Sequence, residues 1–297
     1  MTNPQIAAVR ALLAANPIVK PGATLAVMRA GMDAMGNATP SLSNVTSEQV
    51  DAEGVECFWI SANKATGAPV VLYFHGGGYV MGSAQSHRAM IERLAVAVDG
   101  KVLAVNYRLA PEHPFPAASD DALTAYQWLL NQGIPPQQMA IAGDSAGGGL
   151  AVAALLSIRD ADLPLPACAI AISPWVDMEG LGESMVSKAA LDPMVQKAAL
   201  TQLAPLYLNG VDPRTPLAAP LHAELSGLPP MLIQVGSAET LLDDSTRLAD
   251  RIKSTGGEVT LEVWEEMIHV WHLFAPMLNK GQEAIERVGA FIQQHVT

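Results

Sequence analysis

Short apolar runs of strand length alternate with longer helix-like segments through most of the chain. The apolar runs lie at about residues 55–60, 70–74, 102–106, 138–142, 167–172, 231–235 and 259–263. The helix-like segments lie at about 86–98, 119–131, 146–159, 240–254 and 280–294. Because strands that are joined through helices pair in parallel, this alternation predicts an α/β fold with a mostly parallel central sheet flanked by helices.

Composition agrees with one large α/β unit and excludes some partners. The 297 residues are 50% hydrophobic and only 15% charged, which is enough to bury a sizeable core. The net charge of −12 repels nucleic acid and anionic membrane surfaces, so neither is expected as a partner. No apolar stretch reaches the roughly 20 residues of a membrane span, and no signal-peptide pattern opens the sequence, so we expect a cytoplasmic protein. Cys57 and Cys168 lie in apolar runs and are expected as buried, reduced thiols.

Residues 143–148 read Gly-Asp-Ser-Ala-Gly-Gly, a G-x-S-x-G turn between an apolar run and an Ala/Leu-rich helical pattern. Gly143 and Gly147 allow the chain to bend sharply, while Ser145 projects its hydroxyl above the edge of the sheet. This strand, turn and helix predict a nucleophile elbow with Ser145 as the nucleophile. Because the pentapeptide alone also occurs by chance in loops, the prediction needs a second signal.

The second signal is His75-Gly76-Gly77-Gly78, which directly follows the apolar run Val70–Phe74. Backbone amides without side chains can approach a reacting oxygen closely, so this run predicts an oxyanion hole. The expected donors are the N–H groups of Gly77, Gly78 and Ala146, the residue after the nucleophile.

A serine nucleophile also needs a base and an acid, in the chain order Ser, acid, His. Glu239, Asp243 and Asp244 follow the apolar run 231–236, and His269 follows the run 259–264. Because loops at the carboxyl ends of parallel strands meet at one edge of a sheet, these side chains can converge on Ser145. Asp243 and Asp244 have another explanation, since acidic residues in the first turn of a helix are stabilised by its dipole.

Four motifs in one order resemble a known family. They are HGGGY at 75–79, YRLAPEHPFPAA at 107–118, GDSAGG at 143–148 and MIH at 267–269. With them the chain resembles the bacterial hormone-sensitive-lipase-type esterases of the α/β-hydrolase superfamily. The family's usual acid motif, Asp-Pro-Leu and then Asp, reads Glu239-Thr240-Leu241-Leu242-Asp243 here. The resemblance therefore implies Glu239 as the acid, with Asp243 as the alternative.

The resemblance also implies an α/β-hydrolase fold with a helical cap. The cap would comprise residues 1–40 and 177–209, and the catalytic domain residues 41–176 and 210–297. Short acyl chains are the implied substrates. The last strand, Val259–Val263, would lie at the sheet edge and form a homodimer contact.

The expected function is that of a serine carboxylesterase with the triad Ser145, His269 and Glu239, acting on a small-molecule ester without a cofactor or metal. His272 is set aside as base because His269 matches the motif. Four other histidines have no acidic or histidine neighbours at zinc-binding spacing in the sequence, namely His87, His113, His222 and His295. Two alternatives remain: a non-catalytic receptor on the same scaffold, and an amidase or peptidase using the same triad.

Overall fold

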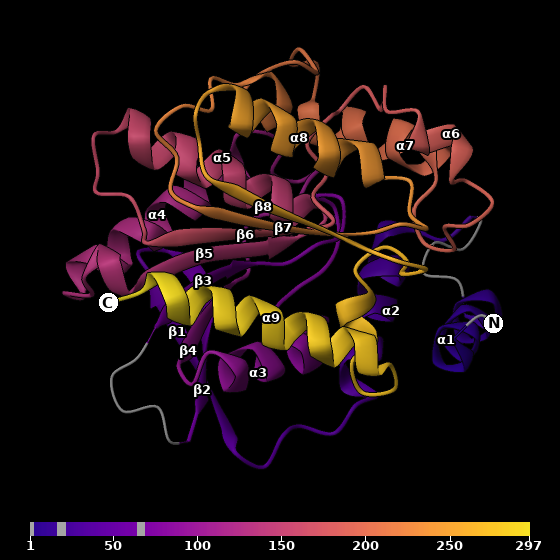
Figure 1. Ribbon diagram of the computed structural model, residues 1–297, viewed down its shortest axis with the longest axis horizontal. Coiled ribbons are helices and arrows are strands. Elements are labelled where there is room, and N and C mark those ends of the chain that lie inside the picture. Colours follow the sequence, from indigo (N-terminus) through magenta and orange to yellow (C-terminus); the bar gives the residue numbers. More distant parts are fainter. Residues whose placement is uncertain (1–2, 17–21, 64–68) are drawn as a thin grey trace.

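The computed structural model describes residues 3–16, 22–63 and 69–297, and these residues form an eight-stranded sheet in the order β1-β2-β4-β3-β5-β6-β7-β8 (Figure 1). The strands are β1 (Val45–Ala52), β2 (Val55–Ala62), β3 (Val70–Phe74), β4 (Lys101–Val105), β5 (Met139–Asp144), β6 (Cys168–Ile172), β7 (Met231–Gly236) and β8 (Val259–Trp264). From β4 to β8 all neighbouring strands are parallel, whereas β1 pairs with β2 and β2 with β4 in antiparallel register. The predicted mostly parallel sheet is confirmed.

Helices cover both faces of this sheet (Figure 1). They are α1 (Pro4–Ala15), α2 (Leu25–Asn37), α3 (Arg88–Ala97), α4 (Ala117–Asn131), α5 (Ala146–Asp160), α6 (Ser184–Ser187), α7 (Lys197–Leu208), α8 (Leu242–Ser254) and α9 (Asn279–His295), with short 3-10 turns η1 (Pro136–Gln138), η2 (Pro220–His222) and η3 (Trp271–Phe274). Along β3, Leu72 and Phe74 enter the core under α4, α5 and α8, while Val71 and Tyr73 enter the core under α3 and α9. Both faces are buried, which explains why the inner strands read as continuous apolar runs.

The seven predicted strands correspond to β2–β8, whereas β1 was not predicted. Most residues of β1 are exposed and polar, so the strand carries no apolar alternation. The turn to β2 holds it in place, because Glu53 and Gly54 both have positive φ (57° and 92°), as a tight hairpin turn requires. Asp51 adds a hydrogen bond of 2.8 Å from the Gly54 N–H. The strand is therefore stabilised by pairing and turn geometry rather than by burial.

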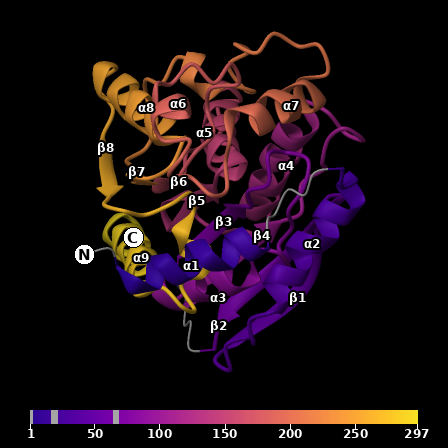
Figure 2. The ribbon, with the colours of Figure 1, turned by 90° about the vertical axis from the view of Figure 1, so that its right-hand side faces the viewer.

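Four helices, α1, α2, α6 and α7, lie in the two segments expected to form a cap. They gather at one end of the sheet, and the view onto that end shows α1 and α2 crossing in front of it (Figures 1 and 2). The N-terminal helix α1 buries Ile6, Val9 and Leu13 in a core that includes Met267 and Ile268. Residues 1–2 and 17–21 of the first segment lie outside the described residues.

Strand β8 lies at one edge of the sheet, as predicted, and β1 at the other.

Within the described residues Cys57 and Cys168 are buried free thiols, and burial raises the pKa of each to about 12. Among the helices of the described ranges, none combines the length and apolar character of a membrane span.

Candidate active site

Ser145 lies at the sharp turn between β5 and α5, as the elbow motif predicts. Its backbone has φ 55° and ψ −121°, a conformation that costs a non-glycine residue about 1–3 kcal/mol. Two hydrogen bonds hold it: the Ser145 N–H donates to the Ile172 carbonyl at 2.8 Å, and the Trp175 N–H donates to the Ser145 carbonyl at 2.9 Å. The backbone at the end of β6 thus fixes the strained turn.

The small residues of the motif allow the elbow to pack closely. A Cβ atom at Gly147 would lie 2.1 Å from the Phe74 carbonyl oxygen, so only glycine lets the start of α5 approach the end of β3. The nucleophile is thereby held beside the loop that follows β3. That loop carries the HGGG run.

The glycine loop presents backbone amides beside the elbow. Gly77 has φ 121°, and a Cβ there would lie 2.1 Å from the Met81 carbonyl oxygen, so the loop cannot keep this shape with a side chain at that position. Among the described residues, no acceptor is bonded to the N–H of Gly77 or Gly78. Ala146 is the first residue of α5, and its N–H has no partner within the helix. Three N–H groups are therefore available in the elbow and the glycine loop.

Asp144 connects the elbow to the glycine loop. It is buried, and its Oδ1 accepts hydrogen bonds from the Gly76 N–H at 3.0 Å and from the Tyr73 hydroxyl at 2.6 Å. Its Oδ2 lies 3.2 Å from Nε2 of His87. Asp144 therefore braces the backbone of the glycine loop and also contacts His87.

Glu239 and His269 are brought together by the loops after β7 and β8. His269 Nδ1 lies 2.8 Å from Glu239 Oε2, and both side chains are buried. Glu239 Oε1 accepts from the Gly236 N–H at 2.6 Å and from the Ser173 hydroxyl at 2.9 Å. Burial alone lowers the pKa of His269, but the adjacent Glu239 carboxylate outweighs it and the net pKa is raised. The arrangement can orient the imidazole and stabilise its positive charge.

Ser173 is a part of this site that the sequence analysis did not find. Its hydroxyl donates to Glu239 and accepts a hydrogen bond of 3.2 Å from the Val270 N–H, next to His269. It therefore ties the loop of the acid to the loop of the histidine. The signal was available, since Ser173 directly follows β6 at the carboxyl edge where polar site residues gather.

The other two carboxylates considered, Asp243 and Asp244, bond elsewhere. Asp243 accepts from the Ser184 N–H at 2.9 Å, and the Ser184 hydroxyl accepts from the Asp243 N–H at 3.0 Å. Asp244 accepts from the N–H groups of Val176 and Asp177, both at 3.0 Å. Burial raises the pKa of Asp244 to about 7. Both aspartates anchor the segment after β6 to helix α8.

Two further histidines near the motifs are structural. His272 is fully buried, and its Nε2 lies 2.8 Å from Gln234 Oε1. Burial lowers its pKa to about 3, so it is a neutral donor to Gln234. His75 stacks on Tyr107 with ring centroids 4.3 Å apart, and its Nδ1 lies 2.8 Å from the Gly76 carbonyl oxygen, so it shapes the glycine loop.

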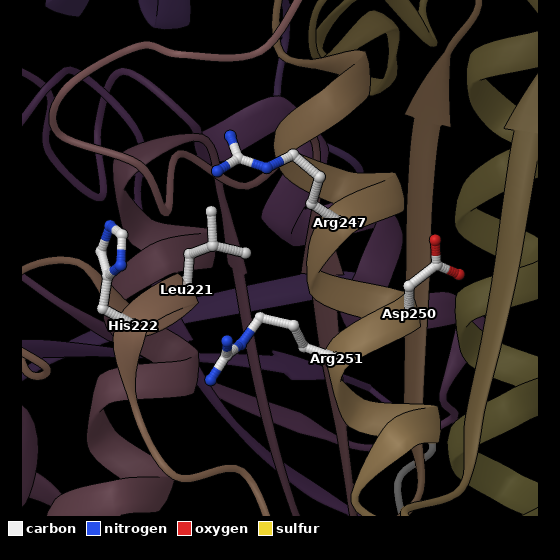
Figure 3. A pocket seen from close by; sticks show the side chains of 5 residues that line it. All are labelled: Leu221, His222, Arg247, Asp250 and Arg251. Atoms are coloured by element: carbon white, nitrogen blue, oxygen red, sulfur yellow. The ribbon is translucent and has the colours of Figure 1, made fainter.

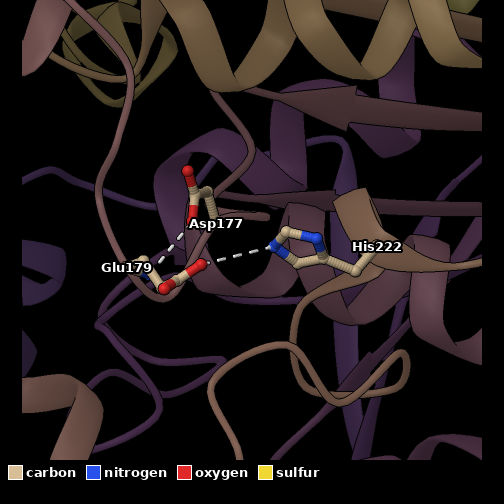
Figure 4. Close-up of side chains that lie close together, drawn as sticks. All are labelled: Asp177, Glu179 and His222. Carbon is tan, nitrogen blue, oxygen red and sulfur yellow. Dashed lines mark hydrogen bonds and ion pairs between the residues drawn. The ribbon is translucent and has the colours of Figure 1, made fainter.

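His222 has no acidic neighbours at zinc-binding spacing in the sequence, but in the fold it lies beside two carboxylates. Asp177, Glu179 and His222 form a cluster that could hold a metal ion (Figure 4). The folding of the segment after β6 onto η2 brings them together. Two guanidinium groups form ion pairs with these carboxylates: Arg247 lies 2.7 Å from Asp177, and Arg214 lies 2.7 Å from Glu179. The cluster is therefore a network of ion pairs.

A shallow pocket of about 410 Å³ lies beside this cluster, between η2 and α8 (Figure 3). Its lining residues are Leu221, His222, Arg247, Asp250 and Arg251. Arg247 pairs with Asp177, and Arg251 donates to the Ala223 carbonyl at 2.8 Å. None of the residues predicted for catalysis lines this pocket, and its cationic side chains are engaged in structural contacts.

The fold and the geometry of the elbow define the class of α/β hydrolases, and the comparisons with known proteins agree. The model of a family described as alpha/beta hydrolase fold matches residues 71–273. An acetyl-hydrolase of Streptomyces hygroscopicus is 45% identical, covering 99% of this chain and 97% of its own length. An esterase of Acinetobacter venetianus is 32% identical, covering 89% and 87%.

Solved structures give the same result. The crystal structure of an esterase from the bacterial hormone-sensitive lipase family has a TM-score of 0.97 and 44% identity over all of both chains. The structure of EstE5 soaked with p-nitrophenyl butyrate has a TM-score of 0.94 and 46% identity over 99% of both chains. The chain belongs to the α/β-hydrolase family and, within it, to the bacterial hormone-sensitive-lipase-type esterases. This membership makes it a carboxylic ester hydrolase.

Proposed function

We propose that the chain hydrolyses short-chain acyl esters with Ser145 as nucleophile, His269 as general base and Glu239 as the acid that orients His269. The observation that carries the proposal is the buried 2.8 Å contact between His269 Nδ1 and Glu239 Oε2, which lies at the same sheet edge as the strained Ser145. A carboxylate on Nδ1 selects the tautomer whose Nε2 can accept the proton of the serine.

The mechanism consists of two acyl transfers. His269 removes the proton of Ser145 as its oxygen attacks the ester carbonyl, and the N–H groups of Gly77, Gly78 and Ala146 stabilise the oxyanion. The alcohol leaves with the proton held by His269. Water then attacks the acyl-enzyme by the same steps. Because one oxyanion donor is worth about 3 kcal/mol of barrier, the shape of the glycine loop matters nearly as much as the triad.

Short acyl chains are proposed because helices of both cap segments lie at the site edge. Leu203 of α7 is so near Gly78 that a Cβ on that glycine would lie 2.7 Å from its Cδ1. The relatives named above include an acetyl-hydrolase and an esterase soaked with a butyrate ester. We therefore assign residues 1–40 and 177–209 to a cap that limits chain length, over a catalytic domain of residues 41–176 and 210–297.

The proposal extends to assembly and location. Within the described ranges strand β8 pairs with β7 alone and has an exposed Val263, so a homodimer through the outer edge of this strand would cover both. Cytoplasmic residence fits the two buried free thiols, which persist in a reducing compartment.

The first experiment compares p-nitrophenyl butyrate with the matching butyranilide, using the native chain and Ser145→Ala. We expect rapid hydrolysis of the ester, little of the anilide, and no ester turnover above background in the variant. Faster cleavage of the anilide would favour an amidase. A Ser145→Ala variant with native activity would rule out the serine mechanism. Turnover of palmitate esters faster than butyrate esters would contradict the chain-length limit.

A further inference from the structure

His87 is a buried side chain that the proposed mechanism leaves unused. It precedes α3 and is only 2% exposed. Its Nε2 lies 3.2 Å from Asp144 Oδ2, while its Nδ1 lies 2.8 Å from the Ser86 hydroxyl and 3.2 Å from the Ser83 carbonyl oxygen.

The surroundings of His87 determine its protonation. The Ser86 hydroxyl donates to the Ser83 carbonyl at 2.8 Å and accepts from the Ser83 N–H at 2.8 Å, which directs a lone pair of its oxygen toward His87 Nδ1. In this arrangement both ring nitrogens of His87 face acceptors, which favours a hydrogen on each nitrogen. The geometry therefore favours the imidazolium form of His87, paired with the Asp144 carboxylate. Burial alone would lower the pKa of His87, but Asp144 outweighs this effect and the net shift is upward.

The Asp144 carboxylate lies next to the nucleophile and the glycine loop, where its charge affects the stability of the oxyanion. A Cβ at Gly76 would lie 2.3 Å from Asp144 Oδ2 and 3.0 Å from the Ser145 Cβ, so the carboxylate is wedged between the glycine loop and the nucleophile. An uncompensated carboxylate here would repel the oxyanion that forms during acyl transfer, because charges interact strongly in a low-dielectric interior.

The other titratable side chains next to this pair do not supply the positive charge that would offset the Asp144 carboxylate. Burial lowers the pKa of His75 to about 3, so its ring, 5.6 Å from that of His87, is neutral. Tyr73 and Tyr107 are buried phenols whose pKa values burial raises, so both stay neutral. Asp33, which accepts a hydrogen bond from the Ser83 hydroxyl, is a further negative group that raises the pKa of His87. His87 is the cation in contact with Asp144.

We infer that His87 is a positioning residue for ester hydrolysis, which neutralises Asp144 and holds it against the Gly76 amide so that the neighbouring amides of the glycine loop bind the oxyanion. The inference rests on the proposed function. His87 acts only through Asp144, and no contact with substrate is required.

The test is a double-mutant cycle of His87→Gln and Asp144→Asn. Glutamine can still donate to Asp144 but carries no charge. For His87→Gln we expect kcat to fall by about tenfold to hundredfold and KM to stay within about twofold. Butylboronic acid forms a tetrahedral adduct with a serine nucleophile, and its affinity should fall in parallel with kcat/KM. Adding Asp144→Asn removes the uncompensated charge while keeping an acceptor for Gly76, so the double variant should recover at least part of kcat.

Three controls make the result decisive. Titration with a fluorophosphonate counts folded, reactive sites, so kcat is given per active centre. Far- and near-UV circular dichroism check the fold, and His113→Gln, at an exposed histidine, should behave as the native chain. Native kcat in His87→Gln, or no recovery in the double variant, would overturn the inference. Failure of the proposed function would be seen separately, as activity retained by Ser145→Ala.

Discussion

Replacement of Glu239 by glutamine tests the triad most sharply, because the structure dictates which way the amide must face. Glu239 Oε1 accepts hydrogen bonds from the Gly236 N–H at 2.6 Å and the Ser173 hydroxyl at 2.9 Å. The amide oxygen must take this place, since turning the NH₂ group toward two donors would lose about 1 kcal/mol for each bond and add repulsion. The NH₂ group then faces His269 Nδ1.

A donor at Nδ1 forces the hydrogen of neutral His269 onto Nε2, the nitrogen that must accept the proton of Ser145. The variant therefore holds the wrong tautomer and cannot stabilise the imidazolium. Loss of both effects costs about 10⁴ in kcat for comparable triads, or about 5.5 kcal/mol of barrier. We expect this loss in Glu239→Gln, with the fold intact.

The assay measures kcat and KM for p-nitrophenyl butyrate across pH. Since Glu239 makes the largest contribution that raises the pKa of His269 against burial, the acidic limb of the residual activity should move to lower pH in the variant. The matched control is Asp243→Asn, whose amide oxygen can still accept from the Ser184 N–H, and it should keep kcat within about threefold. A larger loss in Asp243→Asn than in Glu239→Gln would refute the reasoning and assign the acid role to Asp243.

Three further predictions follow from buried or edge residues. His272→Ala should keep kcat within about threefold. It should lower the free energy of unfolding by about 2–4 kcal/mol in urea titrations, because Gln234 loses its donor and a cavity forms. Inactivation as severe as in His269→Ala would contradict the assignment of the base. Burial raises the pKa of Asp244 from its ordinary value of 3.8 to about 7 in the folded chain, so the folded chain retains a proton that the unfolded chain releases. Stability should therefore fall by up to about 4 kcal/mol as pH rises from 4 to 7. Asp244→Asn should flatten this dependence in urea titrations at pH 5 and 8, and an unchanged slope would exclude Asp244 as its source. Val263→Asp, at an exposed position of the edge strand, should shift the dimer to monomer in sedimentation, whereas a monomeric native chain at micromolar concentration would refute the assembly proposal.

The parts of the fold that the sequence predicted are those with a strong local signal. Strands β3, β5, β6 and β7 are buried along their whole length and read as apolar runs. Strand β1 escaped prediction because pairing with β2 and the turn at Glu53 and Gly54 stabilise it, and neither leaves an apolar pattern.

The residues of the candidate site also divide into those with a local sequence signal and those without one. Ser145, Glu239 and His269 could be proposed because glycines or strand ends mark their positions in the chain. The contact between His87 and Asp144 joins residues 57 positions apart with no common motif, and Ser173 joins loops that follow three different strands. Such partners depend on tertiary packing, which residue spacing does not encode.

The packing of α1 against the histidine loop also governs when an active molecule can exist during synthesis. Ile6, Val9 and Leu13 are translated before the strands of the sheet, but their partners Met267 and Ile268 follow some 260 residues later, and the Asn3 N–H pairs with Glu266 across 263 positions. Such long-range contacts form late, after most of the sheet has been made. On the ribosome α1 must therefore wait with an apolar face exposed. The onset of esterase activity would then report the docking of the two distant parts of the chain.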